Sequence, residues 1–200
     1  MEHINNITYI NLNKRPDRRK LIETELDNFN LQYERFEAVE HIFGPLGCAK
    51  SHLEVIKNAK KKKLSNILIL EDDFTFLVSQ DEFVEQLNLF FNLKIDYDVL
   101  MLSYNLLESR ETEYNFIGKM LKSYTMSGYL VNSKYFDTLI NLWTHSNSLL
   151  ESTGADWLYA IDAIIHNIQP IDKWYYFTKR IGKQIASFSN NANQYRDYNC

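Results

Sequence analysis

Cysteine, glycine and proline are scarce in this 200-residue chain, which contains two cysteines, six glycines and three prolines. Cys48 and Cys200 lie far apart in the sequence, so we expect no disulfide framework and a reducing compartment. No linker rich in proline, glycine or serine divides the chain, and its length suits one compact unit. We therefore predict a single domain over residues 1–200, with a polar, partly mobile tail from about residue 183.

The chain also lacks long apolar runs and an excess of basic residues. No apolar run approaches the roughly 20 residues of a membrane helix, and the N-terminal residues do not form a signal peptide. We therefore expect no membrane span and a cytoplasmic location. With 22 Lys and Arg against 26 Asp and Glu, the formal charge is −4, which gives no electrostatic reason to expect nucleic acid as a partner.

Segments with strand and helix patterns alternate along the chain. Strands or extended segments are expected at 7–12, 32–40, 66–70, 97–103, 125–132 and 168–178. Helices are expected from Pro16 to about residue 29, after a glycine-bearing turn at 44–47, at 81–91, at 133–145 with Ser133 as its cap, and at 155–167. This order predicts an α/β fold with a mostly parallel sheet flanked by helices. In such sheets, ligands bind beyond the carboxyl ends of the strands.

Three acidic residues, Glu71, Asp72 and Asp73, directly follow the buried run at 66–70. Because side chains alternate across a strand, we expect Glu71 and Asp73 on one side and Asp72 on the other. Two carboxylates at a strand end can share a hard divalent cation such as Mn²⁺ or Mg²⁺. The alternative is an acidic turn in solvent. A Walker B strand is excluded, because the chain has no glycine-rich phosphate loop.

Five segments in order, "YINLNKRPDRR", "GPLGCAKSH", "ILILEDD", "SGYLVNSKYF" and "ADWLY", together resemble glycosyltransferase family 25. Its members include lipopolysaccharide-type galactosyltransferases and collagen hydroxylysine galactosyltransferase domains. The resemblance covers about residues 7–189 and implies a GT-A-like, Rossmann-type fold, a UDP-sugar donor, Mn²⁺ (or Mg²⁺) and inversion at the anomeric carbon. The chain is short for this family, and Asn190 stands after Ser189 where the family tends to have aspartate.

Site residues follow from the residues and from the resemblance together. Glu71 and Asp73 are the expected metal ligands. The arginines near the first helix start match phosphate oxygens, and the alternative is a solvated face paired with neighbouring carboxylates. The glycines before the second helix permit close approach of a ligand, and a glycine within a strand often marks such an approach. The expected donor-binding residues are Asn13, Arg15, Arg18, Gly47, His52, Asp72, Ser127, Gly128, Tyr129 and Gln184. Core packing of Tyr129 is an alternative.

Asp156 is the expected catalytic base, because an inverting transfer is a single displacement in which a carboxylate takes the acceptor proton. Trp157, the next residue, could stack on a sugar. The alternative is that Thr153 and Asp156, which have the spacing of a capping box, only start a helix. Asp162 lies six residues further along, and we expect it to face elsewhere.

The sequence therefore predicts a metal-dependent inverting glycosyltransferase. It would move a hexose, galactose or glucose, from a UDP-sugar to a hydroxyl of a glycan or of hydroxylysine. Two alternatives remain open at this stage: a non-catalytic relative that binds a nucleotide or a partner, and a metal-dependent phosphohydrolase.

Overall fold

The structure is a computed structural model that describes residues 3–4, 6–189 and 194–196. Its helices are α1 (Pro16–Asn28), α2 (Gly44–Lys61), α3 (Gln80–Asn92), α4 (Phe136–Thr153), α5 (Asp156–Tyr159) and α6 (Ile161–Ile164), with short 3₁₀ helices η1 (Ser133–Tyr135) and η2 (Ile165–Asn167). Its strands are β1 (Ile7–Asn11), β2 (Glu34–Glu37), β3 (Asn66–Glu71), β4 (Phe74–Phe76), β5 (Val99–Met101), β6 (Asn105–Glu111), β7 (Ile117–Tyr124), β8 (Gly128–Asn132), β9 (Trp174–Phe177), β10 (Gly182–Gln184), β11 (Ser187–Ser189) and β12 (Gln194–Arg196).

Eight of these strands form one sheet in the order β2-β1-β3-β8-β5-β9-β7-β6. The pairings of β1 with β2 and β3, and of β5 with β9, are parallel, whereas β8 is antiparallel to both β3 and β5. β7 is antiparallel to β9 and β6. All strands of this sheet except β8 and β7 therefore run in one direction, which confirms the predicted α/β class with a large, mostly parallel sheet.

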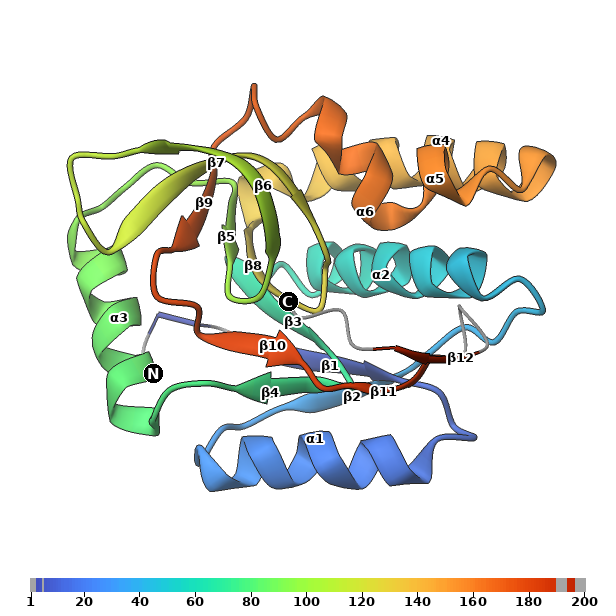
Figure 1. Ribbon diagram of the computed structural model, residues 1–200, viewed down its shortest axis with the longest axis horizontal. Coiled ribbons are helices and arrows are strands. Elements are labelled where there is room, and N and C mark those ends of the chain that lie inside the picture. Colours follow the sequence, from blue (N-terminus) through green and yellow to red (C-terminus); the bar gives the residue numbers. More distant parts are fainter. Residues whose placement is uncertain (1–2, 5, 190–193, 197–200) are drawn as a thin grey trace.

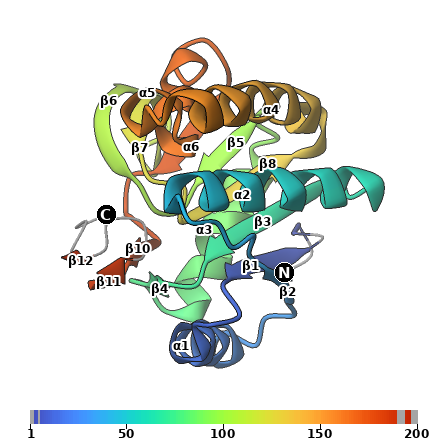
Figure 2. The ribbon, with the colours of Figure 1, turned by 90° about the vertical axis from the view of Figure 1, so that its right-hand side faces the viewer.

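Helices cover both faces of the sheet (Figure 1). On one face, α2 and α4 pack together, and on the other lie α1 and α3. Figure 2 shows α4 over α2, with α1 on the opposite side of the sheet. Strand β3 explains this arrangement: Ile67 and Ile69 join the core under α2 and α4, whereas Leu68 and Leu70 join the core over α1 and α3. The alternation of side chains along a strand thus lets one continuous apolar run fill two cores.

Several local expectations were wrong. The expected helix at 155–167 is interrupted at Ala160, whose ψ of 155° is extended, so that it divides into α5, α6 and η2. Asn132, and not Ser133, caps η1 by accepting a hydrogen bond from the backbone N–H of Lys134. The expected glycine turn is itself helical, because α2 begins at Gly44 with Pro45 in its first turn. The hairpin of β6 and β7 was not predicted.

Two further two-stranded sheets bring the C-terminal part of the chain back to the acidic segment. β10 pairs antiparallel with β4, which places Gln184 opposite Phe74, and the backbone N–H of Ile185 donates to the carbonyl of Asp73 at 2.8 Å. β11 pairs with β12. Asn190 and Cys200 lie outside the described residues. None of the helices in the described part of the chain has both the length and the apolar character needed to cross a membrane.

Candidate active site

A cleft of about 1200 Å³ opens at the carboxyl ends of β1 and β3. This is the edge of the sheet at which ligands bind in α/β proteins, and the volume suffices for a nucleotide-sized ligand. The start of α1, the start of α2, the segment before β8, the helices α5 and α6, and β10 all contribute to its walls. Its polar lining comprises Lys14, Arg15, Arg18, Glu40, His41, Cys48, Ser51, His52, Glu71, Asp72, Asp73, Tyr124, Thr125, Asp156, Asp162 and Gln184.

The acidic segment is buried at the floor of this cleft and is not a turn in solvent. One guanidinium nitrogen of Arg18, Nη1, lies 3.0 Å from Oδ1 of Asp72 and 2.9 Å from Oδ2 of Asp73. Asn11, at the end of β1, donates its side-chain amide to Oδ2 of Asp72 at 2.7 Å. Residues from α1 and β1 thus hold the two aspartates, and all four side chains are mostly buried.

Glu71 and Asp73 share a partner on their other side. The side-chain amide of Gln184 donates to Oε2 of Glu71 at 3.0 Å and to Oδ1 of Asp73 at 3.3 Å. One amide therefore contacts both residues that were expected to project together, although Asp72 and Asp73 also share one nitrogen of Arg18 and lie in the turn after β3. Gln184 is held there by the pairing of β10 with β4.

Negative charge exceeds positive charge at this floor. Burial, together with repulsion from Glu71, raises the pKa of Asp73 to about 7. Burial also raises the pKa of Asp72 despite the opposing charge of Arg18. Burial would raise the pKa of Glu71 too, but the hydrogen bond and charge of His52 and the charge of Arg18 lower it. Three carboxyl groups facing one arginine form a donor set that a divalent cation would neutralise, so these residues fit a hard metal ion.

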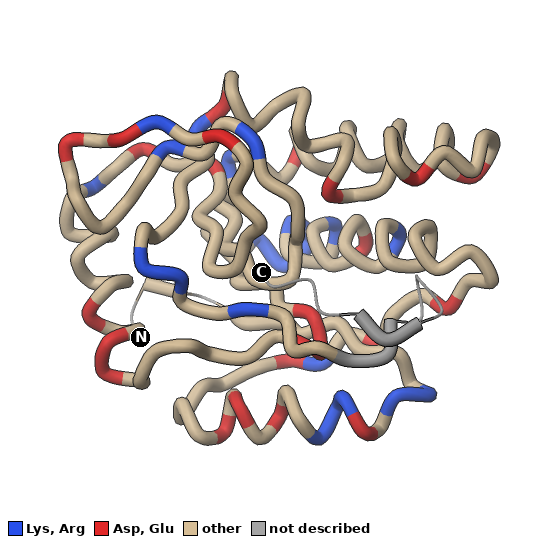
Figure 3. Tube along the Cα trace, viewed as in Figure 1, with Lys and Arg blue, Asp and Glu red and all other residues tan. Residues whose placement is uncertain are grey.

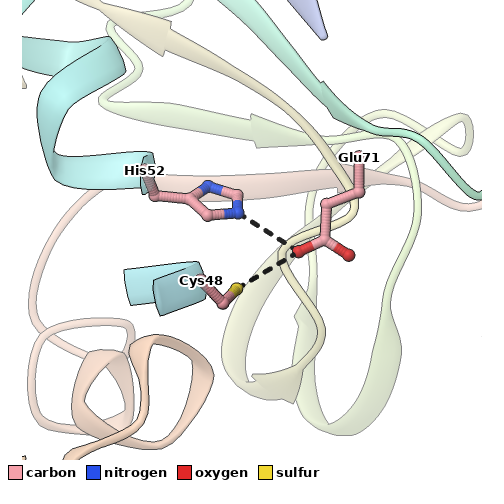
Figure 4. Close-up of side chains that lie close together, drawn as sticks. All are labelled: Cys48, His52 and Glu71. Carbon is pink, nitrogen blue, oxygen red and sulfur yellow. Dashed lines mark hydrogen bonds and ion pairs between the residues drawn. The ribbon is translucent and has the colours of Figure 1, made fainter. Parts of the chain in front are cut away.

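A second set of contacts surrounds the other oxygen of Glu71 (Figure 4). His52 Nε2 lies 3.1 Å from Oε1 of Glu71, and the Cys48 thiol donates to the same oxygen at 3.7 Å. The other ring nitrogen of His52, Nδ1, lies 2.7 Å from the hydroxyl of Tyr129. His52 and Tyr129 are buried, and Cys48 is half-buried. Tyr129 is packed in the core and does not line the cleft, so it contacts the site only through His52.

At the start of α1, Arg15 lines the cleft and also holds Asp17 through its Nε and Nη2 atoms, with Nη2 2.8 Å from Oδ2. Pro16 occupies the first helical position as expected. Asn13 is exposed, does not line the cleft, and accepts a hydrogen bond from Arg35 at 3.4 Å. Basic and acidic residues both lie along α1 (Figure 3), so this helix does not present a purely basic surface.

The glycines differ in what approaches them. A Cβ atom at Gly47 would lie 2.7 Å from the carbonyl oxygen of Val39, so this glycine lets α2 pack against the 39–41 segment. A Cβ atom at Gly128 would lie 2.5 Å from Cε2 of Phe74, so the group close to Gly128 is an aromatic side chain of the protein. Ser127 is buried, and its hydroxyl is hydrogen-bonded to that of Ser103. Neither Ser127 nor Gly128 lines the cleft.

Asp156 is exposed at the first position of α5 and lines the cleft. The expected capping box is absent: α5 has no side-chain cap, and the hydroxyl of Thr153 donates to the carbonyl of Leu149 at 2.6 Å. Trp157 lines the same wall with 72% of its surface exposed. This wall therefore presents a carboxylate and an aromatic ring side by side.

Asp162 also lines the cleft, so the expectation that it faces elsewhere was wrong. In one continuous helix, six residues would place it on a different face from Asp156, but the interruption at Ala160 changes its direction. Burial raises the pKa of Asp162 although its carboxylate accepts a hydrogen bond from the backbone of Thr125, and Glu71 adds to the rise. Thr125 itself has φ of 81°, a conformation that costs energy in a β-branched residue and is concentrated at functional sites.

Comparisons with known proteins bear on this site and on the fold. The family model of glycosyltransferase family 25 (LPS biosynthesis protein) matches residues 43–156, more than half of the chain. The crystal structure of A197 from STIV has a TM-score of 0.53 and 13% sequence identity, covering 96% of this chain and 95% of that chain. A glycosyltransferase involved in the glycosylation of the major capsid of PBCV-1 has a TM-score of 0.53 and 9% identity, covering 86% of this chain and 80% of that chain. At these identities the structural likeness concerns the fold alone. No curated protein sequence matches the chain.

Proposed function

The chain belongs to glycosyltransferase family 25, and from this premise we propose that it transfers a hexose from a UDP-sugar to a hydroxyl group with inversion. Galactose or glucose is the proposed hexose, and a glycan or hydroxylysine is the proposed acceptor. The observation that carries the proposal is the buried set of three carboxylates, with one arginine, at the floor of a cleft at the carboxyl end of β3. Such an excess of carboxylates favours a ligand that brings positive charge.

Glu71 and Asp73 are the proposed ligands of Mn²⁺ or Mg²⁺. When bound, the ion would neutralise the diphosphate of the donor as it leaves. The protein's part is to hold the carboxylates in place: Gln184 fixes Glu71 and Asp73 on one side, and Arg18 fixes Asp72 and Asp73 on the other. These contacts join three distant segments of the chain, which preorganises the site.

The proposed donor contacts fall into two groups. Arg15, Gly47, His52 and Gln184 line the cleft and are proposed to touch the donor. Arg15 offers a guanidinium to phosphate oxygens. Arg18 and Asp72 also line the cleft, where they hold each other. The remaining residues do not line it: Asn13 contacts Arg35, and Ser127, Gly128 and Tyr129 support β8 and His52.

The acceptor side is proposed to be the wall formed by α5 and α6. Trp157 presents its ring to the cleft, where it can stack on the acceptor sugar. Asp156 is the proposed base that takes the proton of the attacking hydroxyl. Asp162 is a second candidate for the same role, because it lines the cleft and its raised pKa makes it a stronger proton acceptor once ionised.

The test starts with binding. Thermal unfolding of the full chain is measured with UDP and GDP, each with and without Mn²⁺. We expect stabilisation by UDP that requires Mn²⁺ and is lost in D73A. The matched control is D98N, because Asp98 is also buried and ion-paired but lies outside the cleft. Equal stabilisation in wild-type and D73A would contradict the proposed metal site.

Turnover then identifies the reaction. Release of UDP from UDP-galactose and UDP-glucose is measured with and without a glycan or hydroxylysine peptide. We expect release to require the acceptor, whereas release at the same rate without any acceptor would indicate a hydrolase. Comparison of D156N with D162N assigns the base: the variant that loses at least about 10²-fold in kcat, the usual contribution of a general base, identifies the carboxylate that takes the proton.

A further inference from the structure

Cys48, His52 and Glu71 bring a thiol, an imidazole and a carboxylate to one point in the cleft (Figure 4). Cys48 and His52 are four residues apart on α2, so they lie on one face of that helix, and this face meets Glu71 at the end of β3. Within the described part of the chain, this is the one group of three such side chains whose potential ligand atoms all lie within 4.8 Å of one another.

We propose that Cys48, His52 and Glu71 form a binding site for Zn²⁺, which shares Glu71 with the oxygen-ligand metal site proposed at Glu71 and Asp73 but adds a sulfur and a nitrogen ligand. A Zn²⁺ ion with tetrahedral bonds of about 2.3 Å to sulfur and about 2.0 Å to nitrogen and oxygen requires edges of about 3.3 Å for N···O and about 3.5 Å for S···O. The corresponding separations here are 3.1 Å from His52 Nε2 to Glu71 Oε1 and 3.7 Å from Cys48 Sγ to the same oxygen. These two edges are therefore close to those that the ion needs, and all three donor atoms lie within 4.8 Å of one another.

The donor atoms select the metal. Sulfur and imidazole nitrogen favour Zn²⁺, whereas Mn²⁺ and Mg²⁺ prefer oxygen ligands. A thiolate and a carboxylate together carry two negative charges, so a bound Zn²⁺ makes this partly buried group neutral. Three protein ligands beside an open cleft leave a fourth position for water or for a ligand.

The two oxygens of Glu71 face different sets of partners. Oε1 faces Cys48 and His52, whereas Oε2 accepts the hydrogen bond of Gln184, which also reaches Asp73. Glu71 thus lies between the sulfur and nitrogen ligands of α2, Cys48 and His52, and the oxygen ligand Asp73. The two groups of ligands differ in chemistry and use different oxygens of Glu71.

The contacts of the three side chains fit the same assignment. The Cys48 thiol donates to Glu71. His52 contacts Glu71 through Nε2 and the Tyr129 hydroxyl through Nδ1. Binding of the ion at Nε2 leaves Nδ1 hydrogen-bonded to Tyr129, so that Tyr129 orients the ligand, as outer partners of metal-bound histidines do. The Cys48 thiol gives up its proton to solvent, so binding releases a proton.

The test uses the full chain without nucleotide, so its failure is independent of the proposed transferase reaction. Co²⁺ is added as a spectroscopic substitute for Zn²⁺. We expect a thiolate-to-cobalt charge-transfer absorption that Zn²⁺ displaces. This absorption is expected to disappear in C48S. It is expected to remain in C200S, in which the other cysteine is changed. Absence of this absorption in the wild type, or its persistence in C48S, overturns the proposal.

Calorimetry supplies a second, independent variant. Zn²⁺ is titrated into the wild type in two buffers of different ionisation enthalpy, and we expect about one proton released per ion. E71Q keeps the thiol and the fold of α2 and is expected to bind Zn²⁺ at least tenfold more weakly. Y129F is expected to weaken binding by about tenfold through the orientation of His52. Unchanged affinity in E71Q, or uptake of Zn²⁺ without proton release, overturns the assignment of these ligands.

Discussion

Arg18 and Asp73 form a buried ion pair of 2.9 Å that joins the first turn of α1 to the end of the acidic segment. The same nitrogen of Arg18 reaches Asp72 at 3.0 Å. Removing one member of a buried ionic group leaves the remaining charges without compensation, which usually costs more than the intact group contributes. Arg18 is therefore a structural requirement of the site as well as a neighbour of its ligands.

Substitution of Arg18 by Met should lower the free energy of unfolding by about 3 kcal/mol at pH 8. The measurement is urea unfolding of the metal-free chain. R19M is the control, because the pair of Arg19 with Glu23 is more exposed and should contribute little to stability. In a D73N background, R18M should lower the free energy of unfolding by about half as much. Only one of the two carboxylates that lose their ion pair, that of Asp72, is then charged. Losses of equal size in both backgrounds would contradict the coupling.

Neutralisation of Asp73 should stabilise the metal-free protein and abolish binding. The pKa of Asp73 is about 7 in the folded chain against an ordinary value of 3.8. The folded state therefore binds more protons than the unfolded state between these values, and this group lowers stability as the pH rises from about 4 to about 7. D73N lacks this penalty, so its free energy of unfolding should exceed that of the wild type by about 4 kcal/mol at pH 8 and by little at pH 4.

Urea unfolding at several pH values measures this difference, and the same samples are tested for Mn²⁺-dependent binding of UDP. We expect D73N to be more stable than the wild type and to have lost the binding of UDP, because buried carboxylates that repel one another lower stability when the ligand is absent. A D73N protein less stable than the wild type at pH 8 would show that Asp73 stabilises the fold.

Removal of the exposed ring on the acceptor wall should weaken acceptor binding selectively. W157A is expected to raise KM for the acceptor by about tenfold, a loss of about 1.4 kcal/mol, while KM for the donor stays unchanged. L158A is the control, because Leu158 is also exposed but does not line the cleft. Initial-rate kinetics with each substrate varied separately measure both values. An equal effect of the two variants would place acceptor stacking elsewhere.

The close contact between Gly128 and Phe74 gives a prediction about packing. G128A should lower the free energy of unfolding by about 2 kcal/mol, because the new methyl group overlaps the Phe74 ring. Phe74 directly follows Asp73, so G128A should also weaken Mn²⁺-dependent binding of UDP. In the double variant with F74L, the loss should be smaller than the sum of the single losses. Additive losses, measured by urea unfolding, would show that the two residues are independent.

The sequence predicted the elements whose pattern is local. The buried run of β3, the helix start at Pro16 and the carboxylates that follow β3 were all recognised from neighbouring residues. The direction of β8 was not, because a short apolar strand has the same pattern in either direction. The hairpin strand β6 was missed since its residues are mostly exposed, so neither alternation nor an apolar run marked it.

The chemistry of the candidate site depends on contacts between distant residues, which no local pattern contains. The pairing of Asp72 with Asn11 and the hydrogen bonds of Gln184, 113 positions from Glu71, arise only when the sheet assembles. The sequence named Gln184 through the family resemblance alone. Asp162 was misplaced because the interruption at Ala160 follows from packing and has no proline or glycine to announce it.

The reversed direction of β8 decides which segment borders the cleft on its inner side. Strands β3 and β5 end at the edge of the sheet where the cleft lies, whereas β8 begins there. The segment that leads into β8, residues 124–126, therefore lines the cleft. None of the carboxylates proposed as metal ligands lies in this segment. Substitutions at residues 124–126 should therefore change the inner side of the cleft and leave the proposed metal ligands unaltered.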